Sequence, residues 1–283
     1  MKVLVTGVAG QLGYDVVREL NKRSIEAIGV DRSDFDITDR EATEKFILSV
    51  NPNAVIHCAA YTAVDAAEDN VELCRKVNVN GTENIARACA KIKVKMLYIS
   101  TDYVFPGSGD IPYDINAEKA PQNVYGQSKL DGELVVQKYL QNYFIVRISW
   151  AFGKNGNNFV KTMLRLGKER EQLSVVSDQI GSPTYTFDLA RLLVDMIRTD
   201  KYGIYHATNE GYCSWAEFAK EIMRLANLPC KIISISTAEY LTKAKRPLNS
   251  RMNKSSLDKN GFVRLPSWQD ALRKYLQSEG YAK

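Results

Sequence analysis

Residues 1–13 read MKVLVTGVAGQLG, an apolar run that leads directly into three evenly spaced glycines. The run predicts a buried strand, and the pattern after it predicts a helix from Leu12 to Leu20. Glycine at positions 7, 10 and 13 lets the backbone turn tightly and approach a pyrophosphate, which the unpaired N–H groups of the following helix attract. The residues assigned to this dinucleotide site are Gly7, Gly10, Gln11, Leu12 and Gly13. The spacing differs from the commoner Gly-x-Gly-x-x-Gly, so a plain strand-turn-helix is the alternative.

Short apolar runs alternate with helical patterns through the first half of the chain. Strands are expected near residues 25–30, 54–56, 96–100 and 144–148, and helices near 40–50, 73–91 and 125–139. This alternation predicts an α/β fold with a doubly wound parallel sheet that helices cover on both faces. We assign residues 1–150 to this Rossmann-like nucleotide-binding domain.

The pattern loosens after residue 150. Helices are expected near residues 158–167, 186–197, 214–226 and 267–275, and strands near 173–176 and 232–235. Since no Gly- or Ser-rich linker separates the halves, residues 151–283 are predicted to form mainly a smaller substrate-binding lobe, with some elements returning to the first domain. Ser214 and Glu217 form the pattern of a capping box, and Trp215 and Phe218 are predicted to be core residues.

Composition and charge exclude several classes of protein. The 283 residues carry a net charge of only +5, without the long basic stripe of a nucleic-acid binder. Five cysteines without a Cys-x-x-Cys, together with only two histidines, argue against a disulfide scaffold and a metal site. No run reaches the roughly 18 apolar residues of a membrane span. We therefore expect a cytoplasmic protein without a nucleic-acid, membrane or metal partner, in which His57 belongs to the core and His206 lies in a strand.

An acidic residue ends the second predicted strand. Asp31 can accept hydrogen bonds from both ribose hydroxyls of a dinucleotide, which slightly favours NAD over NADP. Arg32 beside it either pairs with the 2′-phosphate of NADP or is a solvated loop cation. Asp36, followed by Ile37, either returns under the adenine or caps the next helix. Small residues after the third predicted strand complete the expected cofactor site: Ala59 and Ala60, with Tyr61.

The segment YGQSK (residues 125–129) places Tyr125 and Lys129 four residues apart on one face of a predicted helix. An ordinary phenol is a weak acid at neutral pH, and a nearby cation lowers its pKa toward the working range. Thr101 ends the fourth predicted strand and can donate a hydrogen bond to a substrate carbonyl, because ligands bind outside the carboxyl ends of parallel strands. We hypothesise that these three residues are catalytic. The structural alternatives are an exposed helix face and an ST-turn.

Together these motifs resemble the extended short-chain dehydrogenase/reductases. Within that superfamily the chain resembles the dTDP-4-dehydrorhamnose reductase family through five segments, which are AAYTAVD (59–65), STDYVF (100–105), RISW (147–150), DQIGSPT (178–184) and RPLNS (246–250). The resemblance implies that Tyr125 protonates the C4 keto oxygen of the sugar while NADH or NADPH delivers hydride. By the same resemblance Lys129 holds the nicotinamide ribose and lowers the Tyr125 pKa, both residues belong to the cofactor site, and Thr101 polarises the carbonyl. The product is dTDP-L-rhamnose, a precursor in polysaccharide biosynthesis.

The resemblance also supplies the contacts to the nucleotide sugar. The residues that match substrate positions are Thr101, Asp102, Tyr103, Trp150, Asn249 and Ser250. Related dehydratases place two acids after the threonine, and Tyr103 occupies the second of those positions, which favours plain reduction over elimination.

Two alternatives stay open at this point. One is a reductase of another nucleotide ketosugar. The other is a regulatory subunit of methionine adenosyltransferase, a member of the same family that binds NADP and modulates a partner. Family resemblance alone implies a homodimer. Some relatives dimerise through Mg²⁺ held by acidic side chains, but we interpret Asp15, which matches one such position in kind, as an exposed acid in the first turn of a helix.

Overall fold

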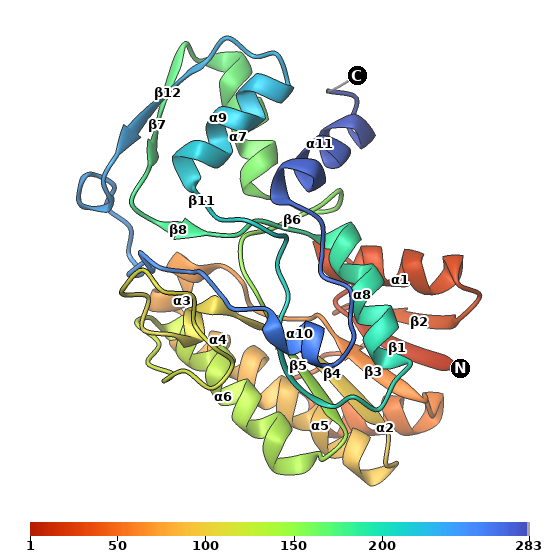
Figure 1. Cartoon of the computed structure of the whole chain (residues 1–283). Coiled ribbons are helices and arrows are strands. Elements are labelled where there is room, and N and C mark those ends of the chain that lie inside the picture. Colours follow the sequence, from red (N-terminus) through yellow and green to blue (C-terminus); the bar gives the residue numbers. More distant parts are fainter. Residues whose placement is uncertain (282–283) are drawn as a thin grey trace.

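The computed structural model describes residues 1–281 and centres on a six-stranded sheet (Figure 1). Its strands are β1 (Lys2–Thr6), β2 (Glu26–Val30), β3 (Ala54–His57), β4 (Lys95–Thr101), β5 (Tyr143–Ile148) and β10 (Gly203–His206). Their order across the sheet is β10-β5-β4-β3-β1-β2, and every neighbouring pair is parallel. Central strands such as β3 are buried on both faces, which explains their continuous apolar sequence.

Helices cover both faces of this sheet, as predicted. On one face α1 (Gln11–Lys22) and α8 (Thr186–Ile197) share a hydrophobic core with β1, β3 and β5. On the other face lie α2 (Arg40–Val50), α5 (Thr82–Lys91) and α6 (Val124–Tyr139), which enclose a second core. The prediction of a doubly wound α/β fold is therefore confirmed.

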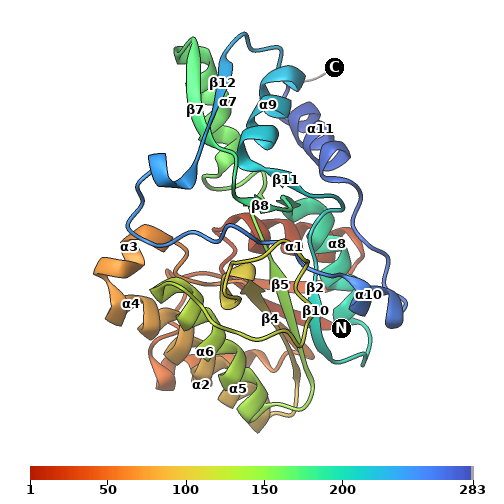
Figure 2. The ribbon, with the colours of Figure 1, turned by 60° about the vertical axis from the view of Figure 1, so that its left-hand side comes forward.

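The second half of the chain contributes to this sheet as well as to a separate lobe. β10 pairs with β5 at the edge of the sheet, and α10 (Ser255–Lys259) packs beside β10. The lobe itself has a core of its own, built from α7 (Phe159–Glu169), α9 (Trp215–Leu225) and α11 (Trp268–Ser278) with the parallel strands β7 (Gln172–Val176) and β12 (Lys231–Ile235). Figure 2 shows the lobe seated over one end of the sheet.

Short elements connect the sheet to the lobe. Two-residue strands pair β6 (Ala151–Phe152) with β9 (Thr184–Tyr185) and β8 (Ile180–Gly181) with β11 (Cys213–Ser214). The remaining short helices are α3 (Val64–Asp69), α4 (Val71–Arg75), the π-helix η1 (Lys76–Gly81), and the 3₁₀ turns η2 (Asp102–Val104) and η3 (Thr237–Glu239).

The helix predicted over residues 73–91 is in fact composite. It begins as α4, continues through the π-helix η1 and ends as α5. The π segment turns Asn78 inward, where its side chain bonds the backbone N–H and C=O of Tyr61 at 2.7 and 3.1 Å and the hydroxyl of Ser128 at 2.9 Å. A uniform helical period cannot reveal such a widened turn.

The helix cap at Ser214 and the burial of His57 agree with the predictions. Ser214 caps α9 in a complete capping box with Glu217, as expected. His57 is buried between Thr6 and Thr82, and burial lowers its pKa to about 3, so it is a neutral core residue as predicted. All five cysteines are free thiols. Within residues 1–281 no helix is both long and apolar enough to cross a bilayer.

Candidate active site

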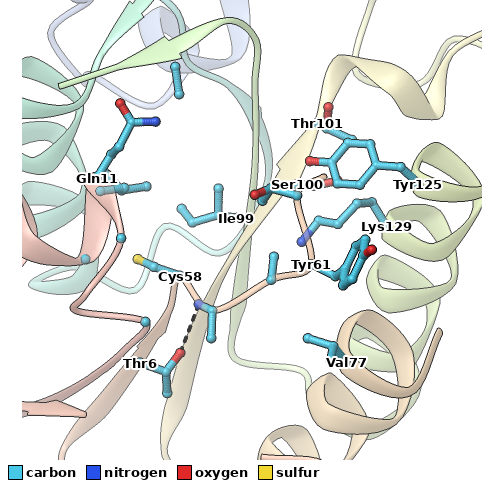
Figure 3. Close-up of a pocket in the computed structure, with 18 of the residues that line it drawn as sticks. Thr6, Gln11, Cys58, Tyr61, Val77, Ile99, Ser100, Thr101, Tyr125 and Lys129 are labelled. Atoms are coloured by element: carbon cyan, nitrogen blue, oxygen red, sulfur yellow. Dashed lines mark hydrogen bonds between the residues drawn. The ribbon is translucent and has the colours of Figure 1, made fainter. Parts of the chain in front are cut away.

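A cavity of about 760 Å³ opens at the carboxyl ends of β1 to β5, between the sheet and the lobe. Most residues predicted for the site line it: Gly7, Gly10, Gln11, Leu12, Gly13, Asp31, Asp36, Ile37, Ala59, Ala60, Tyr61, Thr101, Asp102, Tyr103, Tyr125, Lys129 and Trp150. Figure 3 shows the part of this cavity in which Tyr125 and Lys129 reach from α6 toward Thr101 at the end of β4. The fold thus brings segments from the first 150 residues into one continuous space.

The glycine turn makes the close approach that the sequence predicts. Gly7 has φ +73°, and a Cβ there would lie 2.7 Å from the backbone of Ala59. A Cβ on Gly13 would lie 2.3 Å from the carbonyl oxygen of Gly7. The Thr6 hydroxyl fixes the facing loop by accepting the N–H of Ala59 at 3.2 Å, the dashed bond in Figure 3. The turn is therefore a bare backbone cradle at a helix N-terminus, which suits a pyrophosphate.

The acids after β2 are held in place by their own loop. The Asp31 carboxylate accepts the N–H and the hydroxyl of Ser33, both at 2.8 Å, and these bonds lower its pKa. Asp36 likewise accepts the N–H of Thr38 at 2.9 Å. The cap of α2 is Asp39, so Asp36 does not cap that helix. Arg32 is exposed and lines the same end of the cavity.

Helix α6, which carries Tyr125 and Lys129, is anchored at its first turn. Asn123 caps α6 by accepting the N–H of Gly126 at 2.8 Å. Gly126 packs so tightly that a Cβ on it would lie 2.4 Å from the carbonyl oxygen of Tyr103. Tyr125 and Lys129 therefore start from a fixed backbone. The Lys129 ammonium lies 4.1 Å from the ring centroid of Tyr98, beneath the cavity.

Burial dominates the acid-base properties of this cluster. It raises the pKa of the Tyr125 phenol, and the charge of Asp102 raises that pKa further. Burial also lowers the pKa of Lys129 to about 7, against the opposing charge of Glu133. In the protein alone burial therefore leaves the Tyr125 pKa above its ordinary value, and the lowering of that pKa by Lys129 stays a prediction.

Thr101 is already hydrogen-bonded on both sides. Its hydroxyl donates to Oδ1 of Asp102 at 2.9 Å and accepts the N–H of Tyr103 at 3.2 Å. Asp102 is 3% exposed, and burial raises its pKa to about 6. Protonation of Asp102 weakens it as an acceptor, which makes the Thr101 proton more available to a ligand.

Aromatic side chains form the wall toward the lobe. Trp150, in the left-handed region at φ +49°, stacks on Trp215 with ring centroids 3.8 Å apart. Phe218 is fully buried in the lobe core, as predicted. Trp215 is half-buried: it packs against that core, in partial agreement with the prediction, and it also lines the cavity. Trp215 is the first residue of α9. A side chain at that position can point toward the end of the helix as well as along its buried face.

Two predicted substrate residues lie behind the wall. Asn249 and Ser250 are both buried and are not among the residues that line the cavity. The Asn249 amide donates to the carbonyls of Ser108 and Ile111 at 3.3 and 2.9 Å. The Ser250 hydroxyl lies beside Asp102 and opposes part of the burial effect on its pKa. Both residues support the site from outside it.

Sequence reasoning also missed two cations near the cavity. Lys76, in the π-helix, lines it directly. Arg246 donates to the hydroxyl of Tyr103 at 3.2 Å and pairs with Asp65. Within the RPLNS segment the sequence pointed to Asn249 and Ser250, whereas Arg246 also contacts a side chain that lines the cavity.

Asp15 is not the exposed acid that the sequence suggested. It is 3% exposed, and it accepts the hydroxyl of Thr186 at 2.6 Å where α1 meets α8. Burial raises its pKa. Within residues 1–281 no three His, Cys, Asp or Glu side chains are grouped closely enough to hold a metal ion.

Comparison with known proteins agrees with this architecture. Residues 1–280 match the family described as RmlD substrate binding domain. A curated Escherichia coli K12 relative, dTDP-4-dehydrorhamnose reductase, is 38% identical with 98% of this chain and 97% of its own length covered. The Bacillus subtilis spore coat polysaccharide biosynthesis protein SpsK is 39% identical with 99% of both chains covered.

A solved structure is similarly close. The dTDP-4-dehydrorhamnose reductase of Bacillus anthracis in complex with NADP superposes with a TM-score of 0.96 at 45% identity, covering 98% of this chain and 100% of that one. The match to the family extends over almost every residue of the chain, and these relatives align from end to end. The chain therefore belongs to the RmlD substrate binding domain family, the family of the dTDP-4-dehydrorhamnose reductases.

Proposed function

We propose that this protein is an NAD(P)H-dependent reductase that converts the C4 ketone of dTDP-4-dehydro-L-rhamnose to the alcohol of dTDP-L-rhamnose. The observation that carries the proposal is the convergence of Tyr125, Lys129 and Thr101 on a cavity that continues into the glycine cradle. The names of the full-length relatives support the same reaction.

The residues of the cradle suit a dinucleotide. A Cβ at Gly7 or Gly13 would collide with the backbone, so only a bare turn leaves room for phosphates against the N-terminus of α1. Asp31 and Arg32 stand at the end where the adenosine ribose would lie, one suited to hydroxyls and the other to a phosphate. When bound, the reduced nicotinamide supplies the hydride for the ketone carbon.

The chain's own residues supply the proton and the orientation. Tyr125 donates its phenolic proton to the C4 oxygen as negative charge develops there. Lys129, in its charged form, stabilises the phenolate that results and binds the ribose hydroxyls. Thr101 donates to the same C4 oxygen when its proton is not engaged by Asp102.

The nucleotide sugar is held by the wall toward the lobe. Trp150 and Trp215 offer apolar faces, and Tyr103 presents a hydroxyl that Arg246 orients. Asn249 and Ser250 act from behind by fixing the segments that carry these groups. Five reduced thiols fit a reaction in the cytoplasm, and the family resemblance favours a homodimer.

The test is a turnover assay on the ketosugar generated in situ, with NADH and NADPH supplied separately. We expect cofactor oxidation that depends on the sugar and falls at least about 100-fold in Tyr125→Phe, while cofactor affinity is retained. Turnover of a different ketosugar would support the other-sugar alternative. Cofactor binding without turnover of any ketosugar, together with co-purification of a methionine adenosyltransferase, would support the regulatory alternative.

A further inference from the structure

Glu133 extends the row of Tyr125 and Lys129 along the same face of α6. The three residues are spaced four apart, so they lie above one another on the helix. Glu133 is 2% exposed, beneath the cavity floor, and it accepts the hydroxyl of Ser100 at 2.5 Å. Because Ser100 lines the cavity, only the Ser100 side chain separates Glu133 from the space where the reacting groups meet.

A completely buried arginine fixes this carboxylate. Arg147 of β5 is 0% exposed and donates to both oxygens of Glu133, from Nε at 2.8 Å and from Nη2 at 2.7 Å. Its remaining nitrogen, Nη1, donates to the carbonyl of Ile115 at 2.9 Å and lies 3.4 Å from Nε2 of His206. A two-pronged pair of this kind fixes the orientation of the Glu133 carboxylate and prevents it from turning away.

Lys129 has few other charges near it. Besides Glu133, the titratable groups that face it are His57, Cys58, Cys74, Tyr98 and Tyr125. All five are neutral at pH 7, because burial lowers the pKa of His57 to about 3, raises that of Cys58 to about 12, and raises those of Cys74, Tyr98 and Tyr125. Among these groups Glu133 alone supplies a negative charge to the buried ammonium.

We propose that Glu133, locked in place by Arg147, is a positioning residue that favours the charged form of Lys129. The Glu133–Arg147 ion pair does more than join α6 to β5. It holds a carboxylate one helical turn from the Lys129 ammonium, whose charged form burial disfavours. The catalytic consequence rests on the proposed role of Lys129 in reduction, whereas the electrostatic coupling does not.

The direct experiment follows the ionisation of Lys129 in the cofactor-free protein. Lysine labelled with ¹³C at Cε gives a signal that titrates with the amine, and the Lys129 signal is the one missing from Lys129→Arg. In Glu133→Gln we expect the titration midpoint of Lys129 to fall by about one pH unit. Glu133→Asp is the matched control, because it disturbs the contact with Arg147 but keeps the charge, and its midpoint should stay near that of the wild type.

A double variant provides a second test in case Glu133→Gln alone does not fold. Glu133→Gln leaves Arg147 buried without a partner, so we also propose the double variant Glu133→Gln with Arg147→Gln, which removes both charges together. A lowered midpoint is expected there as well, by a smaller amount, because the positive charge of Arg147 is removed together with the carboxylate. A midpoint equal to that of the wild type in whichever of the two variants folds would overturn the proposal and leave the ion pair a structural brace.

Activity separates this inference from the function it rests on. If Lys129 is catalytic, the alkaline limb of the kcat/KM profile in Glu133→Gln moves to lower pH by the same amount as the midpoint, and in Glu133→Asp it does not move. A shifted midpoint with an unmoved limb would uphold the coupling and remove Lys129 from the proposed mechanism.

Discussion

The indole of Trp150 lies flat on the indole of Trp215, with ring centroids 3.8 Å apart and planes inclined by 16°. Trp150 follows the last residues of β5, and Trp215 begins α9, so the stack joins the sheet to the lobe at the edge of the cavity. A stacked aromatic pair in this place closes the cavity wall and holds the sheet and the lobe together.

Trp215→Ala should therefore weaken use of the sugar more than binding of the cofactor. We expect kcat/KM for the nucleotide sugar to fall roughly tenfold, from loss of the stack and of the wall it forms, while the Kd for the cofactor changes little. Steady-state kinetics and a cofactor titration measure the two effects. Trp215→Phe keeps an aromatic face and is the control; an equal loss in both variants would mean that ring contact is not the cause.

Asp102→Asn should make the protein more stable and less active. The pKa of Asp102 is about 6 in the folded state and 3.8 in the unfolded state, so burial of the charged carboxylate destabilises the fold. This destabilisation is absent below pH 4 and grows as the pH rises through 6. The variant removes this cost and should gain up to about 3 kcal/mol in the free energy of unfolding at pH 7, and almost nothing at pH 3.5. Turnover should fall because the amide oxygen cannot be protonated and so continues to accept the Thr101 hydroxyl.

Urea unfolding at the two pH values measures this difference. Asp110→Asn, at an exposed position, is the control and should change stability little at either pH. A gain for Asp102→Asn that is the same at pH 3.5 and pH 7 would contradict the electrostatic explanation.

Arg32→Ala should discriminate between the two nicotinamide cofactors. If its guanidinium meets the 2′-phosphate, the Kd for NADPH rises roughly tenfold, because one charge-assisted hydrogen bond is lost, and the Kd for NADH does not change. Fluorescence titration with each cofactor gives both values. Arg40→Ala, exposed at the start of α2, controls for net charge. Equal values for wild type and variant would make Arg32 a solvated loop cation.

Gly126→Ala should impair catalysis by moving the start of the catalytic helix. The added Cβ would lie 2.4 Å from the Tyr103 carbonyl oxygen, so α6 must shift and carry Tyr125 with it. A displacement of that order costs roughly 100-fold in kcat. The neighbouring Gln127→Ala, on the exposed side, should be nearly silent. Comparable kcat values for the two variants would show that Tyr125 tolerates the movement.

Much of the sheet could be predicted from sequence because parallel strands buried on both faces are continuous apolar runs. β3 and β5 begin and end within about one residue of the expected positions for that reason. The two-residue strands around β8 were not predictable, since a pair of residues has no period. The π-helix η1 was hidden because its extra residue per turn leaves the composition helical.

The residues of the site likewise fall into those that the sequence could predict and those that it could not. Thr101, Tyr125 and Lys129 follow from spacing and from strand ends, which sequence records locally. Trp215 and Arg246 come to the cavity through long-range packing, and no neighbouring residue in the chain signals that outcome. The pKa values depend on burial, so the direction of the Tyr125 shift could only be found in three dimensions.

The chain passes repeatedly between sheet and lobe, since α8 and β10 return to the sheet after β7, and α10 returns again after β12. Because several segments connect the lobe to the sheet, the lobe cannot rotate about a single linker. We therefore expect closure over a ligand to occur as a small sliding of packed surfaces, in which every connection bends slightly. For the same reason a fragment that ends near residue 150 would lack the edge strand β10 and the helix α8 that packs against α1, and we expect its sheet to unfold.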